Sequence, residues 1–258
     1  MAMIGAANGL GLVFGPAIGG ALAVLGLLFP LYLSILLPFI AFFIIAFIVP
    51  PQKSVSRETV PRLHLWHKRA RPYLLIGFIT VSSIITLQVN AGFYLQDTLK
   101  LTVEGTARIL SVALTLSGLA LVGTQVLQMK VLNWQPNKLI LLGIPISILS
   151  LLLLLVTSSL SIYYVAFFIF GIGVGLIMPG FMSGASLAVS AEQQGAVAGL
   201  IAAVQGIAAI ISPIVSTMLY EVNHSSPFWF LMSLFLFIFI LWVPLTRTKK
   251  PVLQKEIS

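Results

Sequence analysis

Apolar runs long enough to cross a lipid bilayer are the feature that most restricts how this chain can fold. One such run, residues 139–156, is apolar on every side of a helix. A helix rises about 1.5 Å per residue, so about twenty residues cover a hydrocarbon core of roughly 30 Å. A β-barrel would instead need short strands that alternate with a polar lumen face. The sequence therefore predicts an all-α membrane protein, in which each helix bonds its own backbone polar groups.

Turn residues and charges divide the apolar runs into about eight transmembrane helices. Hydrophobic residues make up 59% of the chain and charged residues 8%, a balance that a soluble fold of 258 residues could not cover. The predicted helices span residues 2–25, 28–49, 72–95, 105–129, 137–157, 160–186, 194–220 and 226–246. We expect a pair of helices over 1–49, a basic loop over 50–71, a six-helix bundle over 72–246 and a tail over 247–258.

Lysine and arginine are distributed unevenly between the two sides of the predicted bundle. Loop 50–71 holds six of them, the connection 130–138 holds two and the tail holds four, which makes twelve of the fourteen. Only Lys100 and Arg108 fall on the other side. Cytoplasmic loops carry the excess of Lys and Arg in membrane proteins. We therefore expect a multi-pass protein of the inner (plasma) membrane with both ends in the cytoplasm.

Several function classes are disfavoured by the composition. The net charge of +8 comes from basic residues that lie between apolar runs, so we expect membrane lipids and not nucleic acid as partners. The chain has no cysteine, which excludes disulfides and thiolate chemistry. His64 and His67 have no third ligand nearby, so no metal site is assigned. No Ser-His-Asp set or carboxylate pair shares a depth, so we expect neither an enzyme nor a cofactor.

A regular stripe of glycines runs along the first predicted helix. Gly11, Gly15 and Gly19 recur every four residues, and Pro16 and Gly20 lie beside them in the segment GLVFGPAIGG. A stripe of this kind lets another helix approach closely, while the proline removes one helical hydrogen bond and allows a bend. On these physical grounds alone the segment is an ordinary packing face.

This segment resembles the antiporter signature G-x-x-x-G-P-x-x-G-G in the fifth helix of the drug:proton antiporter (multidrug efflux) branch of the major facilitator superfamily. The resemblance implies a twelve-helix fold of two six-helix pseudo-symmetric bundles, of which an N-terminally truncated chain would hold the last eight helices. It also implies proton-coupled export of drugs or small amphipathic metabolites by alternating access, with the five residues of the signature as a conformational-coupling motif. In one departure from the family, Gln194 stands where an arginine is common.

A weak internal repeat agrees with the twelve-helix count. The first two predicted helices align with the last two, so that Gly15-Pro16 falls on Ser212-Pro213, 197 positions later. A second copy that begins near residue 72 then predicts on the order of 130 residues before residue 1. A truncated exporter and a non-transporting remnant of one are both compatible with this prediction.

Polar residues inside the predicted helices are candidates to line a substrate cavity, because such residues are costly in lipid unless they have a role. The candidates are Ser83, Thr86, Gln88, Asn90, Tyr94 and Gln205, with Met178, Phe181 and Met182 as an adaptable apolar wall. Hydrogen bonding between helices and simple packing are the alternatives for each. No acidic residue lies at mid-depth, so the site that couples a small-molecule substrate to protons is expected in missing N-terminal helices.

Overall fold

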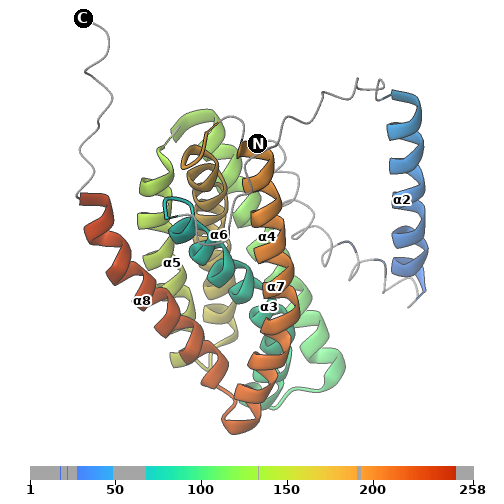
Figure 1. Ribbon diagram of the computed structural model, residues 1–258. Helices are drawn as coiled ribbons and strands as arrows, with labels where there is room; N and C mark the ends of the chain where they lie inside the picture. Colours follow the sequence, from blue (N-terminus) through green and yellow to red (C-terminus); the bar gives the residue numbers. More distant parts are fainter. Residues whose placement is uncertain are drawn as a thin grey trace, which may run out of the picture.

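The computed structural model describes residues 18, 22, 28–48, 68–132, 134–190 and 193–247, and in this part of the chain every regular element is a helix (Figure 1). The helices are α2 (Phe29–Ile48), α3 (Arg71–Leu99), α4 (Val103–Leu127), the π-helix η1 (Gln128–Leu132), α5 (Pro136–Val156), α6 (Leu160–Leu187), α7 (Gln194–Val222) and α8 (Ser226–Arg247). Seven membrane-length helices are found among the described residues, which confirms the predicted fold class. The predicted helix over 2–25, with its glycine motif, lies outside the described residues.

Local sequence signals explain where several helices begin and end. Pro72 and Pro136 occupy the first turns of α3 and α5, where a missing N–H costs nothing. The hydroxyl of Thr102 accepts a hydrogen bond from the Gly105 N–H at 3.2 Å and so caps α4. Helix α3 ends at Lys100, which adopts the left-handed conformation with φ of 51°.

Helices α3 to α8 form one bundle, and α3 is the most buried of them. Within its membrane-length segment 72% of the residues are buried, because α3 contacts α4, α6, α7 and α8. The corresponding fraction is only 28% for α4 and for α7. Helix α2 stands apart from this bundle (Figure 1), and none of its segment from Leu31 to Ile48 is buried within the described residues.

Glycines set the closest helix contacts of the bundle, and most of them belong to α6. A Cβ added to Gly171 would overlap the carbonyl oxygen of Ser117 on α4, and one added to Gly173 would lie 2.9 Å from the backbone nitrogen of Ser147 on α5. The two glycines therefore let the backbones of α4 and α5 approach α6 from two sides. In lipid there is no hydrophobic driving force between helices, so close van der Waals packing, which small residues permit, stabilises such crossings.

Candidate functional site

The polar stripe predicted on α3 lies inside the bundle. Ser83, Thr86 and Asn90 are 0%, 3% and 1% exposed. The Ser83 hydroxyl donates to the backbone oxygen of Thr80 at 2.7 Å, and the amide nitrogen of Asn90 donates to the backbone oxygen of Thr86 at 3.2 Å. These residues are thus brought together on one buried face, with their polar groups partly satisfied by the helix itself.

Asn90 also joins two helices. Its amide nitrogen donates to the hydroxyl oxygen of Ser216 on α7 at 2.8 Å, and Ser216 is 3% exposed. The Ser216 hydroxyl in turn donates to the backbone oxygen of Pro213 at 3.2 Å. The stripe therefore includes a hydrogen bond between α3 and α7, which is one of the two roles that the sequence left open. Contact of these residues with a substrate stays a prediction.

An aromatic cluster lies one turn beyond Asn90. The ring of Tyr94 packs edge-on against Phe228 of α8 at 5.0 Å and against Tyr163 of α6 at 6.4 Å between centroids. All three side chains are buried. This cluster joins α3, α6 and α8, so a substrate that reached Tyr94 would also meet Phe228 and Tyr163.

The predicted apolar wall on α6 lies in the bundle core. Met178 and Phe181 are each 1% exposed, and Met182 packs partly buried against the same core. The ring of Phe181 fills the space above Gly77 of α3, where an added Cβ would lie 2.7 Å from the ring. Of the remaining candidates, Gln88 on α3 and Gln205 on α7 are partly buried.

Helix α4 carries a polar stripe that is exposed, in contrast to that of α3. Arg108, Ser111 and Thr115 are exposed at helical spacing on a membrane-length segment. The hydroxyl of Ser111 donates to the Arg108 carbonyl and that of Thr115 to the Ser111 carbonyl, both at 2.8 Å. Polar residues within membrane helices almost always face other protein or water. The sequence analysis counted Arg108 only among the basic residues and missed the stripe, although the spacing of the three residues signals it.

Helix α7 also has an exposed face within the bundle, and this face consists of small residues. A Cβ added to Gly195, Gly199 or Gly206 would meet no atom within 4 Å, and the intervening Ala202 and Ala203 are exposed. No described residue covers this face. Its small side chains permit the close approach of another helix.

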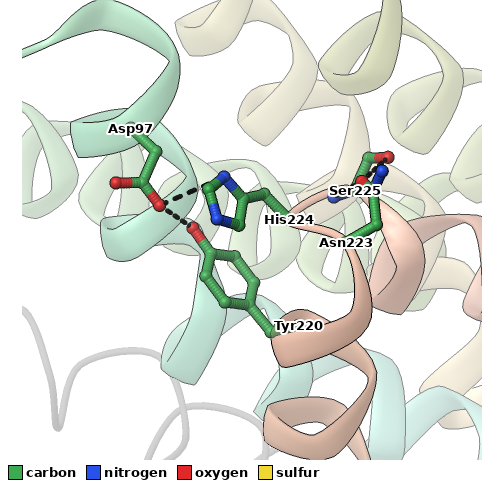
Figure 2. Close-up of polar contacts among 5 residues, drawn as sticks. All are labelled: Asp97, Tyr220, Asn223, His224 and Ser225. Carbon is green, nitrogen blue, oxygen red and sulfur yellow. Dashed lines mark hydrogen bonds and ion pairs between the residues drawn. The ribbon is translucent and has the colours of Figure 1, made fainter.

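A polar cluster joins the C-terminal ends of α3 and α7 (Figure 2). The Tyr220 hydroxyl donates to a carboxylate oxygen of Asp97, and Nδ1 of His224 lies 3.4 Å from the same oxygen. The Tyr220 and His224 rings stack at 4.9 Å, while the Asn223 side chain accepts two hydrogen bonds from Ser225 at the start of α8. The side chains of Asp97 and His224 are 42% and 61% exposed, so water and protons reach the carboxylate.

The sequence analysis did not predict this cluster. Asp97 and Tyr220 lie 123 positions apart in the chain. Nothing in the local spacing of either helix indicates that the two residues meet.

The described ranges contain no group of three His, Asp or Glu side chains that lie close enough together to hold a metal ion. His64 and His67 lie outside these ranges.

Comparison with known proteins identifies the relationship of the whole chain. A family model described as Major Facilitator Superfamily matches residues 1–213 and 134–258, two overlapping segments that together span the sequence. A search of curated proteins finds no match to the chain.

Proposed function

The chain belongs to the major facilitator superfamily, and from this membership we propose that it exports drugs or small amphipathic metabolites in exchange for protons. Its family and its seven described membrane-length helices make it a multi-pass membrane transporter. The finer proposal is supported by the segment Gly11–Gly20, which resembles the antiporter signature of the multidrug efflux branch. We assign the conformational-coupling role to Gly11, Gly15, Pro16, Gly19 and Gly20.

The exposed polar stripe of α4 is the observation that carries the transport proposal. Lipid would give the side chains of Ser111 and Thr115 no hydrogen-bond partners beyond the carbonyls of their own helix, whereas Arg108, the sixth residue of α4, can also reach the membrane interface. Water in a substrate pathway, or a second helix bundle across that pathway, would provide such partners. Alternating access requires such a face, because the bundles move against each other around the bound substrate.

Neutral polar groups give the proposed cavity hydrogen-bonding capacity without a counter-ion for a charged substrate. The candidates on α3 are hydroxyls and amides, and the described acidic residues Asp97, Glu104 and Glu221 all lie at helix ends. We propose Ser83, Thr86, Gln88, Asn90, Tyr94 and Gln205 as the polar contacts, with Met178, Phe181 and Met182 as the apolar wall. Some of these polar groups already form hydrogen bonds within the bundle, so a substrate would have to compete with those bonds.

Dye efflux tests the export proposal. Cells that lack their own efflux pumps would express the complete open reading frame that encodes the chain, and the loss of a fluorescent cationic dye would be followed with and without a protonophore. We expect faster efflux than in control cells, abolished by the protonophore. Gly15→Val should stop it by blocking the glycine stripe, whereas Ala21→Val, six positions further along the chain, should not. Efflux that survives the protonophore would exclude proton coupling.

Single cysteines test the water-filled face, since the chain has none of its own. We expect Thr115→Cys to react with a membrane-impermeant thiol reagent. Ala113→Cys should be unreactive because residue 113 is 0% exposed. Leu149→Cys is the matched control, since Leu149 is 48% exposed on α5 but lies among apolar residues that we expect to face lipid. Equal reactivity at 115 and 149 would remove the support for a polar pathway.

We further propose that both ends face the cytoplasm of the inner (plasma) membrane, as the distribution of Lys and Arg favours. Cysteines at Lys130 and Lys100 should then be labelled from opposite sides of intact cells. Labelling of Lys100→Cys only after permeabilisation would reverse the orientation.

A further inference from the structure

A basic cavity lies where α6 ends and α3 and α7 begin. Its volume is about 620 Å³, and its lining includes Lys68, Arg69, Leu187, Val189, Ser190 and Gln193. These residues belong to three different helix ends, so the cavity exists only because the bundle brings them together. By the proposed orientation this side faces the cytoplasm.

The two cations of the cavity have no acidic partner among the described residues. Lys68 and Arg69 are both exposed, and the one ion pair found in the described ranges is the distant Asp97–His224 contact. Glu192, the acidic residue nearest to the cavity lining in the sequence, lies outside those ranges. Two positive charges in one cavity, neither with an acidic partner among the described residues, attract an anion.

The start of α7 adds a further positive contribution. This helix has 29 residues, and the side chain of its N-cap residue, Gln193, makes no capping hydrogen bond. Unpaired N–H groups at a helix start carry a partial positive charge. Anions bind at such ends when other groups help to hold them.

Hydrogen bonds hold the connection between α6 and α7 in place. The Ser186 hydroxyl donates to the side-chain oxygen of Gln194 at 2.7 Å, and the Gln194 amide donates back to the Ser186 carbonyl at 3.3 Å. The Ser190 N–H donates to the side-chain oxygen of Gln193 at 3.5 Å. The cavity is thus shaped before any ligand arrives, which lowers the entropy cost of binding.

We propose that this cavity binds the phosphate headgroup of an anionic phospholipid from the cytoplasmic leaflet. Lys68 and Arg69 would hold the phosphate. Leu187, which is 74% exposed, and Val189 would contact the glycerol and the upper acyl carbons. Basic pockets between membrane helices on the cytoplasmic side suit such headgroups, and the apolar side chains favour a lipid over a soluble ion. The proposal rests on the proposed orientation but not on transport.

Lipid retention by the purified full chain tests this site. The protein would be placed in micelles that contain either phosphatidylglycerol or phosphatidylcholine, and bound lipid would be counted by native mass spectrometry. We expect preferential retention of phosphatidylglycerol. The double variant Lys68→Gln/Arg69→Gln should bind it about 30-fold more weakly, from about fivefold for each basic residue at the membrane surface. The matched double variant Lys130→Gln/Lys138→Gln removes the same charge outside the cavity and should bind normally.

Two further measurements separate the lipid from a free anion. Leu187→Ser should weaken phosphatidylglycerol binding, because it removes an apolar contact that only a lipid would make. Displacement of the lipid by millimolar inorganic phosphate would show that the site takes a soluble anion, and it would overturn the proposal. An equal loss in the two charge-removal variants would also overturn it, since binding would then follow net charge alone. Circular dichroism would confirm that the variants are folded, and no substrate or ion gradient is needed.

Discussion

Replacing Gly171 of α6 by alanine should loosen the contact between α6 and α4. The new Cβ would overlap the Ser117 carbonyl oxygen and lie 2.8 Å from the carbonyl carbon and 2.9 Å from the Cβ of Ala120, whereas ordinary contact begins at 3.4 Å. Backbone atoms cannot rotate away, so the helices must separate by about 1 Å or more to relieve the overlap with the Ser117 oxygen. A gap of that size forfeits about a quarter or more of each dispersion contact across the interface.

The magnitude follows from two opposing effects. Overpacking of a filled core costs about 1–3 kcal/mol, and a clash with backbone belongs at the upper end of that range. The alanine regains up to about 1 kcal/mol of helix propensity relative to glycine. We therefore expect Gly171→Ala to lower the free energy of unfolding by about 2 kcal/mol. The assay is equilibrium unfolding of the purified protein in mixed micelles by titration with sodium dodecyl sulfate, followed by circular dichroism.

Gly206→Ala on α7 is the matched control. An added Cβ there meets no atom within 4 Å, so only the gain in propensity remains and stability should be equal or higher. The two alanine variants should thus differ by about 3 kcal/mol. A difference below about 0.5 kcal/mol would refute the close approach of α4 and α6.

Three further predictions concern single contacts. A double-mutant cycle of Asn90→Ala and Ser216→Ala should give a coupling of about 0.6 kcal/mol, as is typical of hydrogen bonds between membrane helices, and zero coupling would contradict the contact. Asp97→Asn should speed amide hydrogen exchange in the turn between α7 and α8, whereas Glu221→Gln, an exposed acidic residue nearby, should not. Trp242→Phe should lose packing but no hydrogen bond, because the buried indole N–H has no hydrogen-bond partner among the described residues; a loss of stability above about 3 kcal/mol would reveal a partner.

The helices could be predicted because the features that define them, the length and apolarity of each run, are contained in a continuous stretch of sequence. Length and apolarity along the chain located the seven helices from α2 to α8, and the bounds differ from the predicted ones by a few residues at most ends. Gly171 and Gly175 of α6 lie four positions apart and both face α4, so their spacing is a local signal as well. The membrane fixes these features through its thickness and its lack of hydrogen-bonding groups.

The candidate site was predictable only in part, because the sequence shows which residues are polar but not what they meet. Ser83, Thr86 and Asn90 were identified as polar residues within a predicted membrane helix, yet the bond from Asn90 to Ser216 joins positions 126 apart. The cluster at Asp97 and the exposure of the α4 stripe were missed for the same reason. A periodic pattern gives the residues that share a face, whereas the identity of the facing helix is set by packing.

The sequence by itself determined that this chain is helical, crosses the membrane several times and belongs to a transporter superfamily, since hydropathy and motif are properties of the chain. The tertiary structure alone decided which polar groups are buried, which remain open on α4 and α7, and that Lys68, Arg69 and the start of α7 share one cavity. The physical reason is that lipid enforces helix formation residue by residue, whereas it contributes little to the choice of helix neighbours. That choice depends on shape, small residues and hydrogen bonds between distant parts of the chain.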